Sequence, residues 1–282
     1  NICKKYEHFE LNNVSFTLEP GLITGFIGRN GAGKTTTLKS LLNIVHPYSG
    51  DVLFFGKNFK ENEFEIKQRI GFVAGGIDFY PKKKIKTITA TTRRFYRNWD
   101  DKAYNHYMNM FSLDESKTPD ELSAGMKVKY SLALALSHNA ELLILDEPTS
   151  GLDPVSRDDL LGVFLGLSEK DITILFSTHI TSDLDKCADN IIYIKNGKIL
   201  ASSDLDSFIK QYKVLELTED QLTDDLKLKL IGCKKSKHGY NALIKAPDSV
   251  NISVKIKVSD PDLESIMVHM EKEWLWNEEY AL

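Results

Sequence analysis

Residues 28–36 read GRNGAGKTT, and they stand between an apolar stretch at 22–27 and a segment of helical character that starts near Thr36. The glycines of the stretch are Gly28, Gly31 and Gly33. Glycines this close together let the backbone turn with its N–H groups facing one point, which makes a nest for an anion. The positive end of the following helix adds to the attraction. The stretch therefore predicts a phosphate-binding loop; the alternative is an ordinary turn between a strand and a helix.

The pattern GxxxxGK[ST] is met by Gly28, Gly33, Lys34 and Thr35. In this pattern the lysine supplies a positive charge to the β- and γ-phosphates of a nucleotide, and the Thr35 hydroxyl is placed to bind a magnesium ion. We therefore expect a nucleoside triphosphate with Mg²⁺ at this loop.

The bulk properties exclude several classes of protein. The 36 Lys and Arg residues are outnumbered by 40 Asp and Glu residues, so the net charge of −4 argues against a broad basic face for nucleic acid. The three cysteines are far apart and form no CxxC pair, which fits a reducing compartment better than a zinc or redox site. No apolar run approaches the roughly 20 residues that a membrane-spanning helix needs.

Apolar, strand-like runs alternate with helical segments along the first three quarters of the chain. The runs cover residues 22–27, 70–73, 142–145, 172–176 and 191–194. This alternation is typical of an α/β fold with a mostly parallel sheet. Between about 81 and 139 the strand signal disappears, and we interpret this part as an inserted helical subdomain. We place the end of this first domain, 1–212, after a predicted closing helix at 205–212.

The remainder, 213–282, predicts a small α+β domain. Alternate residues between 250 and 258 are apolar, which favours a half-buried strand. Asp260-Pro261 is expected to cap a helix that follows. Trp274 and Trp276 are interpreted either as a dimer or partner contact or as packing on that helix.

Two acidic residues end the buried run in the sequence LLILDEP. Asp146 comes at the carboxyl end of the predicted strand, where ligands bind in such sheets, and is expected to hold the magnesium ion. Glu147 follows, and a carboxylate there can orient or deprotonate the water that attacks the γ-phosphate. The alternative is a strand that ends in acidic turn residues before Pro148.

His179 follows another buried strand in the sequence ILFSTHI. It is expected at the same edge of the sheet, where its ring can contact the γ-phosphate and hold the attacking water. The alternative is a structural histidine.

The sequence LSAGM at 122–126 opens a predicted amphipathic helix. Its first residues, Ser123, Ala124 and Gly125, offer free N–H groups and a positive dipole end to an anion. A capped core helix is the alternative.

Taken in order, GRNGAGKTT, LSAGM, LLILDEP, SGLD and STH resemble the nucleotide-binding subunit of an ATP-binding cassette (ABC) transporter, over about residues 1–212. The resemblance implies a P-loop ATPase domain, ATP and Mg²⁺ as ligands, and a head-to-tail dimer of two identical or two different ATPase subunits. Each ATP would lie between the phosphate loop of one subunit and the start of the Ser123 helix of the other. Asp153 would bridge the subunits, and Tyr6 would stack on adenine, with a core tyrosine as the alternative. The implied ATP contacts in the loop are Gly28, Asn30, Gly31, Ala32, Gly33, Lys34, Thr35 and Thr36.

Two departures from the family pattern stand out. Gly75 takes the place of a glutamine that usually contacts magnesium and lies on the route to the membrane partner, and Asp78 is a weak substitute. Ala124 and Met126 replace a glycine and a glutamine in the signature. Because the backbone donors survive this second change, ATP binding is expected to persist.

The resemblance implies a subunit that hydrolyses ATP at the cytoplasmic face of the cell membrane, attached peripherally to transmembrane permease subunits and binding no nucleic acid. A groove between 71 and about 99 is expected to receive the partner's cytoplasmic helix. The C-terminal domain loosely resembles the appendage of single-cassette exporter ATPases, so we expect export of peptides, antimicrobials or lipids.

Two other functions stay open at this point. The first is a soluble ABC-type ATPase acting on ribosomes or DNA, although such proteins usually carry two cassettes or a long coiled-coil insertion, and this chain has no sustained heptads. The second is a module that senses ATP without turnover, against which Glu147 argues.

Overall fold

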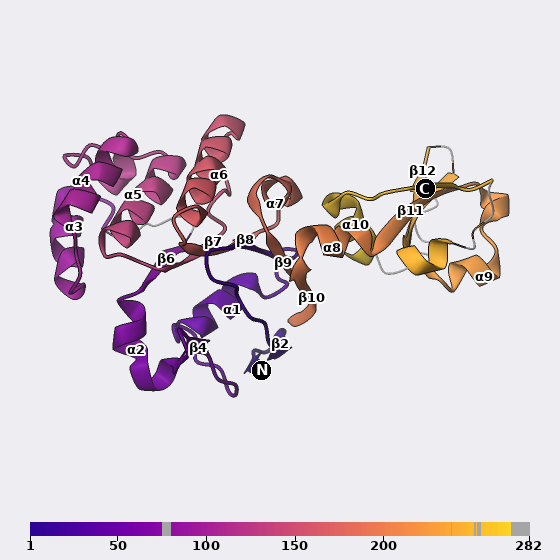
Figure 1. Ribbon diagram of the computed structural model, residues 1–282, viewed down its shortest axis with the longest axis horizontal. Coiled ribbons are helices and arrows are strands. Elements are labelled where there is room, and N and C mark those ends of the chain that lie inside the picture. The colour runs from indigo at the N-terminus through magenta and orange to yellow at the C-terminus, as the bar shows by residue number, and fades with distance from the viewer. Residues whose placement is uncertain (75–79, 238, 251, 253–254, 272–282) are drawn as a thin grey trace. The chain divides into compact units, whose positions relative to one another are not determined.

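The structure is a computed structural model, which describes residues 1–74, 80–237, 239–250, 252 and 255–271. The chain forms two compact units, Asn1–Ser202 and Ser203–Leu282. Their helices and strands are drawn in Figure 1. Gly75, Asp78, Trp274 and Trp276, singled out above, lie outside the described residues.

The first unit is built on a six-stranded sheet with the strand order β10-β9-β3-β8-β7-β6. The four pairs from β9 to β6 are parallel, as the alternation of strands and helices predicts. The bounds are β3 Ile23–Ile27, β6 Ile70–Ala74, β7 Leu142–Asp146, β8 Thr173–Thr178, β9 Asn190–Lys195 and β10 Lys198–Asp204. The central strands β3 and β7 are buried along their whole length, which is why they appear in the sequence as continuous apolar runs.

Helices cover both faces of this sheet. Figure 1 shows α1 on one face and α6 with α7 on the other. The bounds are α1 Lys34–Leu41, α6 Pro154–Ser168 and α7 Thr181–Cys187. Helix α7 lies directly on β3 because Gly25 has no side chain: a Cβ there would come within 2.0 Å of Leu184 Cδ2.

Two short hairpins lie on the same side of the sheet as α1 (Figure 1). Strands β1 (Ile2–Lys5) and β2 (Glu10–Val14) pair antiparallel, as do β4 (Leu53–Phe54) and β5 (Lys57–Asn58). Helix α2 (Phe59–Lys67) begins at Asn58, whose side chain accepts a hydrogen bond from the Lys60 amide. Apolar residues of these hairpins share one core with the sheet.

The segment between 81 and 139 is helical, and it contains no strand among the residues that the structure describes there. Its elements are α3 Ile85–Thr92, η1 Arg93–Phe95, α4 Asp101–Met110, η2 Pro119–Glu121 and α5 Ala124–Ser137. A buried hydroxyl cluster ties three of these helices together, because Thr89 Oγ1 lies 2.9 Å from Tyr104 Oη and 2.8 Å from Tyr130 Oη. Satisfied buried hydrogen bonds of this kind fix the packing of the helices.

The second unit contains a four-stranded sheet with the order β12-β13-β11-β14 and antiparallel pairs. The bounds are α8 Leu205–Lys210, β11 Tyr212–Leu217, η3 Glu219–Gln221, α9 Asp224–Lys227, β12 Leu230–Ser236, β13 Gly239–Lys245, η4 Ala246–Ser249, β14 Lys257–Ser259 and α10 Leu263–Glu271. Helix α8 belongs to this unit and not to the first, because it packs on β11 through Phe208 and Tyr212, whose rings are 5.4 Å apart.

The predicted strand at 250–258 is wrong for the described residues before Lys257. Strand β14 covers Lys257–Ser259 only, and Val250 is 79 % exposed after the turn of η4. Ile252 and Ile256 do pack on the hydrophobic core of the second unit. The alternation of apolar residues in the sequence therefore reflects side chains that are partly buried in a turn, and not a strand. The cap of the following helix, α10, is also shifted from the predicted Asp260-Pro261. The Asp262 carboxylate accepts a hydrogen bond from the Ser265 amide at 2.7 Å.

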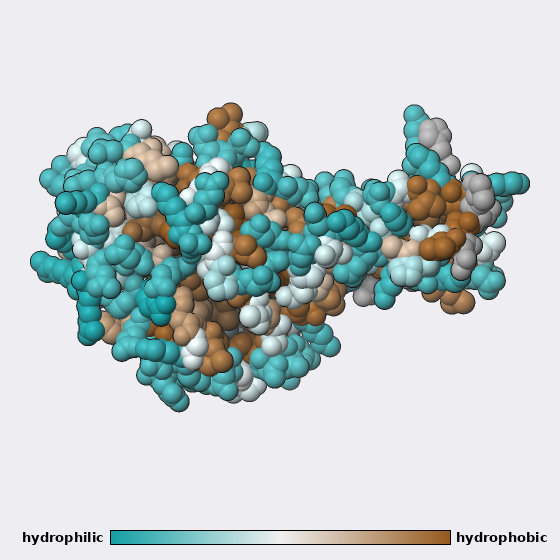
Figure 2. Space-filling view, in the orientation of Figure 1, coloured by the Kyte–Doolittle hydropathy of each residue, from teal (hydrophilic) through white to brown (hydrophobic). Residues whose placement is uncertain are grey.

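No helix in the described part of the chain is both long enough and apolar enough to cross a membrane. In Figure 2 the visible face of the first unit is mostly hydrophilic, with apolar side chains in separate patches.

The fold predicts a pH dependence that comes from His138. This ring is buried, stacks on Tyr96 with centroids 3.7 Å apart and donates from Nδ1 to the Gln68 carbonyl. Burial lowers the pKa of His138 from its ordinary 6.5 to about 4. The unfolded chain therefore binds one more proton between these two pH values, and stability falls as the pH drops through this window. The loss is on the order of 3 kcal/mol, because one pKa unit is worth about 1.4 kcal/mol.

The measurement is urea unfolding at pH 7, 6, 5 and about 4 for wild type and for His138→Gln, whose amide can still donate to Gln68 but cannot titrate. We expect the variant to lose less stability than wild type across this range. Equal losses in the two proteins would contradict the assignment.

Candidate functional site

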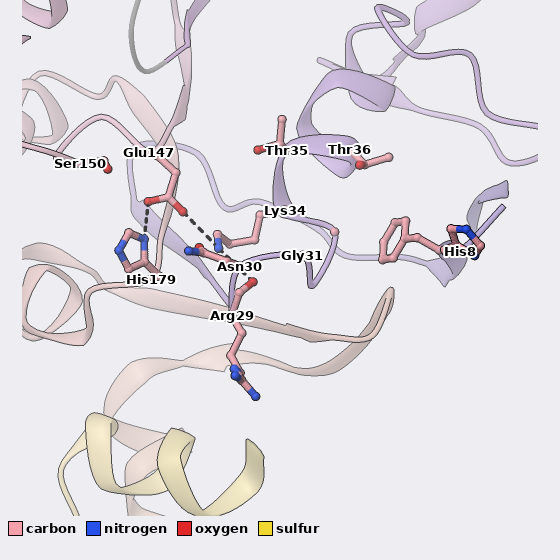
Figure 3. Close-up of a pocket in the computed structure, with 12 residues that line it drawn as sticks. His8, Arg29, Asn30, Gly31, Lys34, Thr35, Thr36, Glu147, Ser150 and His179 are labelled. Atoms are coloured by element: carbon pink, nitrogen blue, oxygen red, sulfur yellow. Dashed lines mark hydrogen bonds and ion pairs between the residues drawn. The ribbon is translucent and has the colours of Figure 1, made fainter. Parts of the chain in front are cut away.

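A cavity of about 660 Å³ lies at the phosphate loop of the first unit. It is lined by His8, Phe9, Arg29, Asn30, Gly31, Gly33, Lys34, Thr35, Thr36, Glu147, Ser150 and His179. Figure 3 shows Glu147 between Lys34 and His179, with Thr35 and Thr36 on the helix beside the loop and His8 on the opposite side. The residues come from the segments that follow β3, β7 and β8, together with the β1–β2 hairpin.

The loop needs its glycines for two different reasons. Gly31 and Gly33 have φ values of 83° and 113°, in the left-handed region that side chains rarely adopt. At Gly33 a Cβ would also come within 2.7 Å of the Phe9 ring. Gly28 is needed because the chain packs closely, since a Cβ there would lie 2.4 Å from the Ile194 carbonyl oxygen. The loop is therefore closed by backbone packing and leads directly into α1, whose first N–H groups have no acceptor within the helix.

Lys34 is held inside this loop. Its side chain is only 5 % exposed, and its Nζ donates to the Gly28 carbonyl at 2.7 Å. The same Nζ lies 3.1 Å from Glu147 Oε1. A buried ammonium group needs such partners, and together they place its charge at the floor of the cavity.

Glu147 is the second half of this ion pair and also contacts His179. Its Oε2 lies 2.9 Å from His179 Nδ1, and its side chain is 22 % exposed. The backbone of Glu147 is left-handed, with a φ of 51°, which is unusual for a residue with a side chain and marks a position that the surrounding structure fixes. The carboxylate therefore lies in the cavity between the Lys34 ammonium group and the His179 imidazole.

Asp146 contacts Thr35, and only 7 % of this aspartate is exposed. Its Oδ1 accepts hydrogen bonds from Thr35 Oγ1 at 3.0 Å and from Ser177 Oγ at 2.7 Å. Hydroxyl and carboxylate oxygens are the ligands that Mg²⁺ prefers, and here they converge beside the loop. Thr35 and Asp146 therefore supply oxygen atoms of the kind that would hold a magnesium ion.

Ser177 was not predicted from the sequence. Its hydroxyl donates to Asp146 and accepts from the Glu147 amide at 2.9 Å, so one side chain orients both acidic residues. The signal that could have found it is the sheet register, in which Asp146 lies opposite Ser177. His8, Phe9, Arg29 and Ser150 also line the cavity without having been predicted.

Several predicted residues do not line this cavity. Tyr6 is 44 % exposed, and its ring centroid lies 6.5 Å from that of Phe9, which does line the cavity. Gly28 and Ala32 lie behind the loop, where the Ala32 carbonyl accepts from the Gly197 amide. Stacking of Tyr6 on adenine stays a prediction.

Ser123, Ala124, Gly125 and Asp153 are also absent from the lining of the cavity. Ser123 caps α5, with its hydroxyl accepting from the Met126 amide at 3.2 Å. Asp153 caps α6 by accepting from the amides of Val155 and Ser156, and the hydrogen bonds from Ser156 lower the pKa of its carboxyl group. Within one chain, both residues act as helix caps.

Comparison with known proteins gives a consistent picture. The family described as "ABC transporter" matches residues 11–150. The chain is 34 % identical to the ABC transporter ATP-binding protein YtrB of Bacillus subtilis, over 74 % of this chain and 72 % of that protein. It is 35 % identical to the bacitracin transport ATP-binding protein BcrA of Bacillus licheniformis, over 79 % and 72 %. A solved structure titled as an ATP-binding subunit of an ABC transporter aligns with a TM-score of 0.67 at 25 % identity, over 74 % of this chain and 90 % of that one.

The site predicts a specific effect of Ser177→Ala. The variant removes the hydroxyl that orients Asp146 and the Glu147 amide, while the phosphate loop is unchanged. We expect hydrolysis of ATP with Mg²⁺ to fall by about 10- to 100-fold, as losses of residues that orient metal ligands typically do. Binding of ATP without Mg²⁺ should change little.

The matched control is Ser168→Ala. Ser168 Oγ donates to the Gly21 carbonyl, before the first residue of β3 and away from the loop. This variant should lose some stability and keep its hydrolysis rate. Equal rates for Ser177→Ala and Ser168→Ala would show that Ser177 has no special part in the site.

Proposed function

The chain belongs to the ABC transporter family as an ATP-binding, ATP-hydrolysing subunit, and from this premise we propose that it powers export through separate transmembrane subunits. The observation that carries the hydrolytic part of the proposal is the line formed by Lys34, Glu147 and His179 at the phosphate loop, with contacts of 3.1 and 2.9 Å. The transport part is supported by the relatives. One relative is named for bacitracin transport, which favours an antimicrobial compound or a peptide as the exported substrate.

The loop and the start of α1 would bind the phosphates of ATP. Their N–H groups and the helix dipole attract anions. Lys34, buried at the floor, would exchange its contact with Glu147 for one with a phosphate oxygen. Glu147 would then keep only His179 as a partner, and its free oxygen could orient or deprotonate the attacking water.

Thr35 and Asp146 would hold Mg²⁺, since their oxygens lie 3.0 Å apart beside the loop. The ion would offset the charge that develops on the phosphate oxygens. Ser177 keeps Asp146 in place for this role.

A second ATPase subunit would complete the site, because Ser123, Ala124 and Gly125 do not line the cavity of their own chain. Ser123 and Ala124 are exposed at the start of α5, a helix of 14 residues, so its positive end is accessible to a nucleotide held by another subunit. Asp153 would lie at the same interface. ATP would favour the closed dimer through contacts that only this state makes, and hydrolysis would remove the preference.

The proposal places the subunit at the cytoplasmic face of the cell membrane, docked on permease subunits. The test is copurification from detergent-solubilised native membranes, using Glu147→Gln with ATP and Mg²⁺ and identifying bound proteins by mass spectrometry. This variant should bind ATP and hydrolyse it slowly, so that the ATP-bound state accumulates.

The control is Lys34→Ala under the same conditions, which removes the charge that would bind the phosphates. We expect a polytopic membrane protein to copurify with Glu147→Gln. Ribosomal or DNA-associated proteins without a membrane partner would overturn the transport proposal in favour of the soluble ATPase.

A further inference from the structure

Asp183 is a buried acidic residue that the proposed mechanism does not yet use. It lies in α7, four residues after His179, and is 1 % exposed. Its Oδ2 accepts a hydrogen bond from Thr149 Oγ1 at 2.6 Å. Thr149 is fully buried and follows Glu147 by two residues. One hydrogen bond therefore joins the loop that carries Glu147 to the helix that follows His179.

The other oxygen of Asp183 is poorly satisfied. Among the described residues, Asp183 Oδ1 and Arg157 Nε are both buried and have no hydrogen-bond partner. The two atoms lie 3.9 Å apart, which is within reach of an ion pair but too long for a hydrogen bond. Leaving a buried donor and a buried acceptor unsatisfied is unfavourable, so a shift of about 1 Å that joined them would satisfy both groups at once.

The surroundings of Asp183 strengthen its charge interactions. Cys187 Sγ donates to the Asp183 carbonyl oxygen at 3.3 Å. Burial, followed by the charges of Asp183 and Asp189, raises the pKa of this thiol to about 12. In such a poorly solvated place, an ion pair responds more strongly to a small change in distance than it would at the surface.

Arg157 connects this pair to a third part of the site. It lies on α6, and its amide donates to the Asp153 carbonyl at the start of that helix. Asp183 therefore lies where the segments that carry Glu147, His179 and Asp153 meet. A second pair between the same two helices, Lys186 with Asp158, is exposed on both sides, and exposed pairs contribute little.

We infer that Asp183 is a positioning residue for ATP hydrolysis: it holds the Glu147 loop through Thr149 and completes a hydrogen bond with Arg157 when the site is closed on ATP. The inference rests on the proposed function. It differs from a purely structural role, in which Asp183 would only stabilise the packing of α6 and α7.

The test compares kcat and KM for ATP in matched variants. Asp183→Asn keeps the shape and an acceptor for Thr149 but removes the charge that faces Arg157. Thr149→Val removes the hydroxyl with little change in shape, and Thr149→Ser restores it. We expect kcat to fall by about 10- to 100-fold in Asp183→Asn and Thr149→Val, the scale of a small misplacement of reacting groups. KM should stay within about twofold, since the phosphate loop is untouched.

The controls separate positioning from stability. Thr149→Ser should recover most of the lost kcat, and Asp158→Asn, which breaks the exposed pair between the same helices, should have the wild-type kcat. The melting temperature of each variant is measured alongside. A wild-type kcat in Thr149→Val, or in folded Asp183→Asn, would overturn the inference.

If Asp183→Asn does not fold, the comparison of Thr149→Val with Thr149→Ser decides alone, with equal kcat values counting against the inference. Absence of ATP hydrolysis in the wild-type chain would instead refute the proposed hydrolytic mechanism itself. The two failures are therefore distinguishable.

Discussion

The parallel pairing of β3, β7 and β8 is the constraint on which the site depends. In the observed register Ile27 lies opposite Thr178, and Asp146 lies opposite Ser177. The carboxyl ends of the three strands therefore reach the same edge of the sheet together. The phosphate loop, Glu147 and His179 come directly after these ends, and Asp146 is the last residue of β7. Residues that are far apart in the sequence therefore lie close together at one edge of the sheet.

Within this frame, polar contacts decide what each side chain can do. Lys34 is buried and needs a negative partner, which Glu147 provides. Glu147 in turn is oriented by His179 and by a left-handed backbone. Ser177 donates a hydrogen bond to Asp146, and Thr149 donates one to Asp183. These bonds connect the acidic segment to β8 and to α7. In the proposed mechanism the acidic residues are thus held by hydroxyl groups that contact no nucleotide.

The sequence predicted the sheet because central parallel strands are buried on both faces and appear as uninterrupted apolar runs. It predicted the phosphate loop because few other structures need glycines at those spacings together with Lys34 and Thr35. It failed at 250–258, where alternating burial belongs to a turn and to the short strand β14. It also missed Ser177, a single serine within the buried strand β8, and Asp183, because an aspartate in the first turn of a helix is common. Their contacts arise from the register and from the packing of α6 on α7, which no local pattern contains.

The most direct test of the account is steady-state phosphate release from ATP by Glu147→Gln, compared with wild type and with Glu169→Gln, the same exchange at the exposed end of α6. The account predicts that hydrolysis by Glu147→Gln falls by about 100-fold or more, the contribution expected of a general base, while ATP still binds. Glu169→Gln should match wild type. Undiminished hydrolysis by Glu147→Gln would contradict the assignment of Glu147 as the catalytic carboxylate.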